Sequence, residues 1–170
     1  GAADQGYVAL LGLLDMSAAF DTVDHDILLE RLATSFGMAG TALAWLRSFL
    51  TGRSQQVSFN GGLSSIGLIT TGVPQGSVLG PLLFLLYTAD VPLIANQHGL
   101  GIHCYADDGQ IYVFDKAAEA VGMINKVASC IEEIDRWMSS NRLKLNSEKT
   151  QFIWLGSRQL LKVSVVNVQL

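Results

Sequence analysis

A stretch past the middle of the chain, residues 102–114, does most to limit the folds available to this sequence. Two runs rich in β-branched and aromatic residues flank the tetrapeptide Ala106-Asp107-Asp108-Gly109, whose composition is typical of a turn. The pattern predicts an antiparallel β-hairpin with two carboxylates at its tip. Because Asp-Gly turns are very common and are mostly solvated, the meaning of these carboxylates depends on what lies beside them.

A second strand is predicted over residues 8–14, a continuous apolar run that suits burial on both faces and is too short for most helices. The run ends at Asp15, so pairing of this strand with the hairpin would bring three carboxylates to one edge of a sheet. Such a cluster repels itself unless cations bind. Mg²⁺ is usually held by one or two carboxylates plus substrate phosphates, and a pair of such ions about 4 Å apart supports phosphoryl transfer. Asp15, Asp107 and Asp108 are therefore candidate metal ligands.

The first half of the chain carries two helical patterns and a glycine turn. Asp24 or Asp26 is placed to cap a helix that presents apolar residues on one face and stops at Gly37, and residues 41–50 predict a second helix. Residues 55–59 and 63–70 predict a peripheral hairpin through Asn60-Gly61-Gly62. The residues on which these predictions rest are Leu28, Leu32 and Phe36 for the first helix, and Thr41 as cap, Leu43, Leu46, Leu50 and Gly52 for the second.

The second half predicts two more helices and two short strands. Pro81 fits the first position of a helix that runs to about residue 89, since its missing N–H would be unpaired there. Residues 117–140 carry the strongest helical periodicity, and residues 143–145 and 152–155 resemble strands. With no repeat, low-complexity tract or linker, the economical interpretation is one α+β domain over residues 1–170. The periodic residues of the long helix are Val121, Ile124, Val127, Ile131, Ile134 and Met138.

Composition narrows the classes of function. With 49% apolar and 15% charged residues the chain is expected to be globular, and its longest apolar runs are far shorter than the roughly 18 residues of a membrane span. The start of the chain does not resemble a secretory signal, and Cys104 and Cys130 form no CxxC pair, so both are expected to be reduced and buried. The net charge of −4 argues against a general nucleic-acid-coating protein, so any such function must come from a local site. Arg47 and Arg53 either meet a phosphate backbone or are ordinary surface residues.

Three ordered motifs resemble those of reverse transcriptases from non-LTR (LINE-type) retrotransposons. They are LDMSAAFDTVDH at residues 14–25, GVPQGSVLGP at residues 72–81 and YADD at residues 105–108. Residues 137–141, followed by LKLNSEKT at residues 143–150, resemble the stretch after the catalytic hairpin of that family. Each motif is short, but their order and spacing make a chance match improbable. The resemblance implies an α+β polymerase palm, a small antiparallel sheet packed against helices, with part of the fingers and without complete fingers and thumb.

The resemblance also implies roles for individual residues. Asp15 and Asp107 match the two metal ligands, Asp108 the second hairpin carboxylate, and Met16 a ligand through its backbone carbonyl, with two Mg²⁺ ions bound and Mn²⁺ as a possible substitute. Phe20 matches the aromatic gate that excludes a ribose 2′-hydroxyl, although its apolar character alone fits an ordinary core residue. Gln75 and Gly76 match nucleotide-contacting positions, with Gly72 allowing close backbone approach, and Lys149 matches a lysine that neutralises or protonates the departing pyrophosphate. His25 and His103 are expected to be structural.

The implied reaction is RNA-directed DNA synthesis, with an RNA template, a DNA primer and deoxynucleoside triphosphates as partners and no membrane. The family implies an intracellular location, in the nucleus and cytoplasm, and the oligomeric state stays open. Two alternatives remain at this point. One is another palm-type nucleotidyl transferase such as a cyclase or a viral RNA polymerase, which Phe20 and the VPQG loop disfavour. The other is a catalytically inactive retroelement-derived fragment with a structural or binding role.

Overall fold

The computed structural model describes residues 6–157 and Leu161 of the chain. Contacts between residues group the fold into two compact units, which are described separately below. The sheet unit consists of Gly1–Ser17 and Ala89–Leu170, and the helical unit consists of Ala18–Thr88. A single domain over residues 1–170 stays a prediction, because grouping by contacts does not establish whether the two units fold independently.

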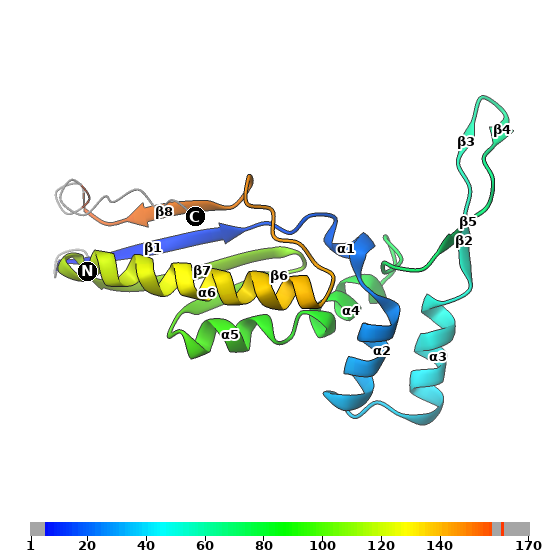
Figure 1. Cartoon of the computed structure of the whole chain (residues 1–170), viewed down its shortest axis with the longest axis horizontal. Coiled ribbons are helices and arrows are strands. Elements are labelled where there is room, and N and C mark those ends of the chain that lie inside the picture. The colour runs from blue at the N-terminus through cyan, green and yellow to red at the C-terminus, as the bar shows by residue number, and fades with distance from the viewer. Residues whose placement is uncertain (1–5, 158–160, 162–170) are drawn as a thin grey trace. The chain divides into compact units, whose positions relative to one another are not determined.

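The sheet unit is built on four antiparallel strands in the order β6-β7-β1-β8 (Figure 1). These are β1 (Tyr7–Leu14), β6 (Gly101–Tyr105), β7 (Asp108–Lys116) and β8 (Gln151–Leu155). The hairpin, the first strand and the last strand predicted from sequence are thus confirmed. The turn between β6 and β7 is shorter than expected, since Asp108 already belongs to β7 and only Ala106 and Asp107 connect the strands.

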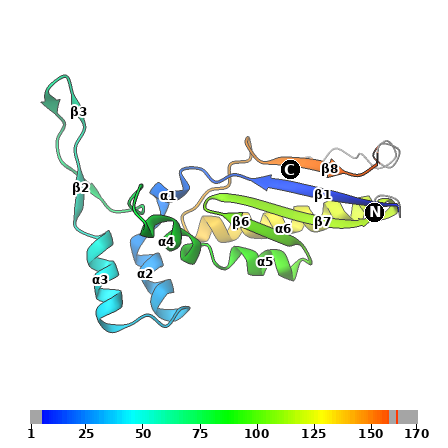
Figure 2. The same ribbon diagram turned by 180° about the vertical axis from the view of Figure 1, so that it is seen from behind.

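One face of this sheet is covered by helices. The helices α5 (Val91–Gln97) and α6 (Ala120–Ser140) lie on the same side of the strands, as the opposite views in Figures 1 and 2 show. Residues of β1 alternate between buried and half-buried, so burial on both faces was wrong: the strand is fully covered only on its helix side. The fully buried core here includes Leu10, Ile111, Met123 and Ile134.

The long helix begins later than its periodicity predicted. Residues Ala117–Glu119 form a 3₁₀ turn, η2, and α6 follows from Ala120. This start leaves Val121 61% exposed, and Met123 and Cys130 take buried positions instead. Residues 143–145 do not form the predicted strand. Only Leu145 is paired, in an isolated β-bridge with Met16. Cys130 is buried as expected, whereas Cys104 is exposed, because it lies on the edge strand β6.

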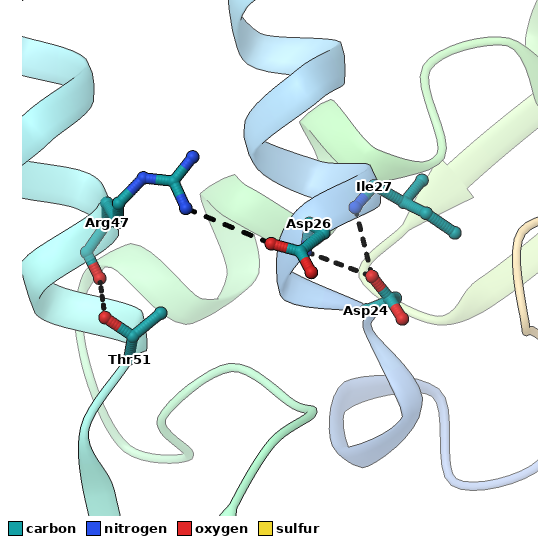
Figure 3. A network of polar contacts seen from close by, with 5 residues as sticks. All are labelled: Asp24, Asp26, Ile27, Arg47 and Thr51. Carbon is teal, nitrogen blue, oxygen red and sulfur yellow. Dashed lines mark hydrogen bonds and ion pairs between the residues drawn. The ribbon is translucent and has the colours of Figure 1, made fainter.

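The helical unit contains α1 (Ala19–Thr22), α2 (His25–Thr34), α3 (Gly40–Leu50) and α4 (Leu79–Tyr87), with α2 packed on both α3 and α4. Asp24 caps α2 by accepting hydrogen bonds from the backbone N–H groups of Asp26 and Ile27, both at 3.0 Å (Figure 3). The predicted cap is therefore confirmed at Asp24. Leu28 and Leu32 are fully buried.

Three details of these helices differ from the sequence-based prediction. Phe36 lies beyond the end of α2 and is 40% exposed, because the helix stops at Thr34. Ala39 rather than Thr41 precedes the first residue of α3 and offers no side-chain cap. Pro81 is the third residue of α4, which starts at Leu79 and ends at Tyr87 rather than near residue 89. A proline is still tolerated there, since backbone N–H groups of a first turn have no partner within the helix.

A two-part ribbon of strands follows α3 (Figure 1). Its base pairs β2 (Arg53–Gln55) with β5 (Gly67–Ile69), and its tip pairs β3 (Ser58–Phe59) with β4 (Gly62–Leu63) around the predicted turn. The expected hairpin is confirmed as peripheral, but it is interrupted into two short ladders. Its side chains are largely exposed, including Phe59 at 77%.

One stretch of the described residues, Leu79–Gln97, is long and apolar enough to cross a membrane when judged by length and composition alone. In the structure it is divided into α4 and α5 by a turn at residues 88–90, and 44% of the window tested is buried. Core helices of soluble proteins meet the same criterion, so this stretch is weak evidence for a membrane span.

Candidate functional site

Two of the candidate metal ligands meet at one end of the sheet. Strands β1 and β7 pair with Leu14 opposite Gly109, and continuing this register past the end of β1 places Asp15 beside Asp108. Side chains alternate along a strand, so Leu13 and Asp15 share a face. Asp15 and Asp108 accordingly line one cavity of about 360 Å³ in the sheet unit.

Lys149 joins the two aspartates in this cavity. Its Nζ lies 3.6 Å from Oδ2 of Asp15. The chain before it is anchored to the same place, because the backbone N–H of Asn146 donates to the carbonyl of Asp15 at 2.8 Å. The backbone N–H of Thr150 in turn donates to the carbonyl of Asn146, which fixes the turn that carries Lys149.

The environment of Asp15 Oδ2 fits a cation. This oxygen is buried and accepts no hydrogen bond from the described residues, and Lys149 at 3.6 Å contributes an ion pair rather than a hydrogen bond. A buried carboxylate oxygen without a hydrogen-bond donor is costly unless a positive charge compensates it. The side chain as a whole is 30% exposed, so the carboxylate remains accessible from solvent.

The expected meeting of all three carboxylates is not found among the described residues. No group of three or more histidine, cysteine, aspartate or glutamate side chains there is arranged to hold a metal ion. Asp107 lies in the two-residue turn and does not line the cavity, while Asp108 begins β7 and does. Neighbouring residues at the end of a strand point in different directions, so Asp107 and Asp108 are not expected to face the same space.

Met16 is placed so that its carbonyl stays free of the local pairing. It forms an isolated antiparallel bridge with Leu145. The two hydrogen bonds of this bridge are made by the neighbouring residues: the N–H of Asn146 donates to the carbonyl of Asp15, and the N–H of Ser17 donates to the carbonyl of Lys144. The bridge therefore does not use the Met16 carbonyl, and the Met16 side chain is buried at 8% exposure. The assignment of this carbonyl as a ligand stays a prediction.

The residues matched to nucleotide binding come together in the helical unit. Phe20, Gln75 and Gly76 line one cavity of about 380 Å³ with Pro74, Ser77, Gly80 and Pro81. The Phe20 ring packs against Phe84, with ring centroids 4.9 Å apart. Phe20 thus packs on a core residue and also borders open space, and its assignment as the sugar gate stays a prediction.

The loop that carries Gln75 is fixed by its own chain. The backbone N–H groups of Gly72 and Val73 donate to the carbonyls of Val23 and Phe20 at 2.7 and 2.8 Å. Gly72 has a φ of +89°, and a Cβ there would lie 3.0 Å from the carbonyl oxygen of Asp21. Close packing against α1 is therefore enough to require glycine at this position.

Histidine and aspartate side chains support the same loop. The buried His25 donates from Nε2 to the carbonyl of Gly72 at 2.8 Å, which confirms a structural role. Asp21 accepts from Nε2 of Gln75 at 2.8 Å and so orients the amide of that glutamine. His103 lies on the exposed strand β6 and stacks on Tyr112 with centroids 5.4 Å apart.

Sequence reasoning missed Glu148 and Gln151, which also line the cavity of Asp15. Glu148 adjoins Lys149 in the SEKT segment, so its place in the motif was the available signal. Gln151 lies opposite Leu13 in the β1–β8 pairing and on the same face, which only the register reveals.

An antiparallel sheet with helices on one face and carboxylates where its central strands end is the arrangement expected of a polymerase palm. The model of the family "Reverse transcriptase (RNA-dependent DNA polymerase)" matches residues 2–165. The chain belongs to the reverse transcriptase family, whose members generally use divalent metal ions.

Curated relatives are RNA-directed DNA polymerases of non-LTR retrotransposons. The enzyme of mobile element jockey from Drosophila melanogaster is 30% identical over 155 residues, which are 88% of this chain and 16% of that protein. The jockey enzyme of Drosophila funebris is 33% identical over 141 residues, 80% of this chain and 15% of that protein. The probable enzyme of transposon BS from Drosophila melanogaster is 33% identical over 144 residues, 81% of this chain and 15% of that protein. The chain thus spans about a sixth of the length of these relatives.

Solved telomerase structures share the fold. Apo telomerase from Candida tropicalis, truncated from its C-terminal domain, superposes with a TM-score of 0.67 at 17% identity, covering 88% of this chain and 31% of that one. Telomerase from Candida albicans, in complex with a fragment of telomeric RNA, gives a TM-score of 0.66 at 15% identity, covering 85% and 27%. The likeness confirms the α+β palm fold expected from sequence.

Proposed function

We propose that this chain is the palm part of an RNA-directed DNA polymerase that adds deoxynucleotides to a primer 3′-hydroxyl during retrotransposition. The observation that carries the proposal is the buried Asp15 Oδ2, which accepts no hydrogen bond from the described residues and lies in one cavity with Asp108 and Lys149. Membership of the reverse transcriptase family supports the same chemistry.

Asp15, Asp107 and Asp108 would hold two Mg²⁺ ions, with the Met16 carbonyl as a further ligand. When bound, the metal ions lower the pKa of the primer hydroxyl and neutralise charge on the phosphates. Asp107 would join the other two carboxylates from the turn before β7, since it does not line their cavity.

In the proposed reaction the primer 3′-hydroxyl gives up its proton to water and its oxygen forms a bond to the α-phosphorus of a deoxynucleoside triphosphate. The bond from that phosphorus to the bridging α–β oxygen breaks, and pyrophosphate leaves. Lys149 carries the positive charge that meets the departing pyrophosphate. Its side chain is 70% exposed and only 3.6 Å from Asp15, so it is both mobile enough and close enough for this role. Protonation of the leaving oxygen by its ammonium group would complete the transfer.

Phe20 and Gln75 would select and position the nucleotide. The Phe20 ring is braced by Phe84 and borders a cavity, an arrangement that supports exclusion of a 2′-hydroxyl by contact. Gln75 is held by Asp21 and keeps its amide oxygen for other partners. RNA as template is proposed from the family and from the RNA complex of the Candida albicans telomerase.

Metal affinity provides a test. Mn²⁺ is titrated by calorimetry into the 170-residue chain with deoxythymidine triphosphate present, in the wild type and in the variants Asp15→Asn and Asp107→Asn. Each variant is expected to lose at least about tenfold in affinity, since a hard divalent cation loses a charged oxygen ligand. The matched control is Asp26→Asn, which removes the same charge from a side chain that is 92% exposed.

Unchanged affinity in both Asp15→Asn and Asp107→Asn would contradict the assigned metal site. It would favour the alternative of an inactive fragment that has kept the fold for a binding role. A loss in Asp15→Asn alone would keep the metal at the cavity of Asp15 and Asp108 and would remove Asp107 from the ligand set.

A further inference from the structure

A second cavity of about 470 Å³ in the helical unit adjoins the cavity of Phe20 and shares Pro74 and Gln75 with it. One wall is the base of the ribbon, where Arg53 and Gln55 of β2 pair with β5. The opposite wall is the loop of residues 70–75 together with Asp21. Polar side chains from both walls therefore face the same space.

The loop wall is held in place by hydrogen bonds within the chain. Thr71 donates from Oγ1 to the carbonyl of Asp21 at 2.9 Å, and Gln75 donates to the carboxylate of Asp21 at 2.8 Å. The backbone N–H of Gly72 adds a third bond, to Val23 at 2.7 Å. A wall that is already ordered costs little conformational entropy when a ligand binds to it.

Arg53 supplies a positive charge that is held in no ion pair among the described residues. Within residues 6–157 no hydrogen bond or ion pair is described for its guanidinium, although it is only half exposed. Arg47 is the contrasting case, because its NH1 atom lies 3.9 Å from Asp26 across α2 and α3 (Figure 3). The sequence left the roles of both arginines undecided, and the structure separates them. Arg47 forms an ion pair with Asp26 on the surface, whereas Arg53 lines a cavity and has no described ion pair or hydrogen bond.

With one cation and one carboxylate in its lining, this cavity favours a singly charged phosphodiester over a multiply charged triphosphate. A guanidinium binds phosphate oxygens through two parallel N–H donors. A nucleoside triphosphate carries several negative charges, which the carboxylate of Asp21 would repel and which Arg53 alone could not offset. A phosphodiester carries one negative charge, which one arginine can offset. The neutral groups of Gln55 and Thr70 can bond to a sugar or base edge without adding charge.

We propose that this cavity binds one phosphodiester of a single nucleic-acid strand, with Arg53 as the phosphate-binding residue and Gln55 on the adjoining sugar or base. The identification of that strand as the template rests on the proposed function. The strand contact compensates locally for the net charge of −4, which otherwise opposes binding of nucleic acid.

Binding of the dinucleotide uridylyl-(3′→5′)-uridine tests the proposal, because it contains a single phosphodiester. The ¹⁵N-labelled 170-residue chain is titrated without divalent metal, and the side-chain Nε–Hε signal of Arg53 and the backbone signals of residues 70–75 are followed by NMR. Uridine serves as the ligand without phosphate, and deoxythymidine triphosphate as the competing source of phosphate. Omitting metal separates this result from the proposed catalytic site, which can fail while the strand contact holds.

The expected result is a dinucleotide affinity that falls about tenfold or more in Arg53→Gln, as the loss of a charge-assisted hydrogen bond predicts. Arg47→Gln removes the same charge and is expected to change the affinity less than about twofold, because that arginine is paired with Asp26. Arg53→Lys keeps the charge without the paired donors and should fall between the two. Uridine should not shift the Arg53 signal.

Three outcomes overturn the proposal. They are an unchanged affinity in Arg53→Gln, an equal loss in Arg53→Gln and Arg47→Gln, and Arg53-dependent binding of the triphosphate that is tighter than that of the dinucleotide. The second would mean a bulk charge effect, and the third would assign the cavity to the free nucleotide. If Arg53→Gln does not give the spectrum of a folded chain, Arg53→Lys decides, and an affinity equal to that of the wild type then overturns the assignment.

Discussion

At the scale of single residues, the three candidate metal ligands fall into two groups: two that border the same cavity and one that lies in a turn. Asp15 and Asp108 lie on the face opposite the helices and share a cavity, whereas Asp107 occupies the turn. All three lie at one end of the sheet because each follows or precedes a strand, but among the described residues they do not form the expected cluster. The sequence did not reveal that only Asp15 and Asp108 share a cavity, because this depends on the strand register and on the length of the turn that holds Asp107.

The sugar gate makes a prediction at this scale. In a polypeptide of the length of the relatives that carries this sequence, Phe20→Val should raise ribonucleotide incorporation relative to deoxynucleotide by at least about tenfold, because a smaller side chain leaves room for a 2′-hydroxyl. Primer extension with each nucleotide type measures the ratio. Phe49→Val is the control, since Phe49 stacks on Trp45 in α3 and does not line the cavity of Phe20. Retained activity with an unchanged ratio would leave Phe20 a packing residue against Phe84.

Cys130 predicts a dependence of stability on pH. Burial raises the pKa of this thiol from its ordinary value of 9.0 to about 11, and the carboxylate of Glu133 adds to the effect. Between these two pKa values the unfolded chain releases a proton that the folded chain keeps, so stability is full below pH 9 and falls as the pH rises towards 11. Chemical unfolding at several pH values between 9 and 11 should therefore show that the free energy of unfolding falls less steeply with pH in Cys130→Ala than in the wild type. Identical slopes would mean that the thiol does not titrate differently in the two states.

At the scale of elements, hydrophobic periodicity correctly predicted the strands and helices that pack against the core. The strand β1, the hairpin β6–β7 and the helix α6 follow from apolar patterns, because each buries one continuous face. The wrong predictions concern segments whose sequence pattern suits a strand or helix but which do not pair or pack as that pattern requires. Residues 143–145 have strand composition but pair at one bridge only, and Phe36 continues the spacing of α2 past the point where the helix stops.

Two glycines in different elements predict opposite changes in stability. Gly72→Ala should lower the free energy of unfolding by about 1–3 kcal/mol, because its φ is +89° and a Cβ would press on backbone atoms of Asp21. Gly122→Ala should raise it by up to about 1 kcal/mol, since this glycine lies in α6 with only Glu119 within 4 Å of the added Cβ. Urea denaturation of each variant measures both changes. Equal effects would contradict the claim that backbone conformation, rather than loss of flexibility, fixes glycine at position 72.

At the scale of the whole molecule, the order of three motifs predicted the family and the palm fold, and both are confirmed. Composition could not do this alone: a net charge of −4 argues against nucleic acid, while the motifs argue for it. The conflict disappears if affinity comes from local features such as Asp15 with its metal ions and Arg53 with a phosphate. Features of this kind depend on register and on loop packing, so the sequence could only name Asp15 and Arg53 as candidates.

The last prediction is that these 170 residues by themselves extend a primer negligibly, although every candidate catalytic aspartate is present. The chain corresponds to about a sixth of its relatives, and its negative net charge gives little attraction for a duplex. Displacements of about 1 Å at a reacting centre can cost roughly 100-fold in rate, so side chains that are present but loosely held do little.

Primer extension on RNA and DNA templates, with Mg²⁺ or Mn²⁺, compares this chain with a polypeptide of the relatives' length that contains it. The longer protein should extend the primer and should lose that activity in Asp107→Asn, whereas the short chain should stay at background in both forms. Background activity in both proteins would favour an inactive fragment, since then even full length does not restore catalysis. Robust extension by the short chain that depends on Asp107 would contradict the prediction in the other direction: the two units alone would hold primer and template, and the net charge would matter less than the local contacts at Asp15 and Arg53.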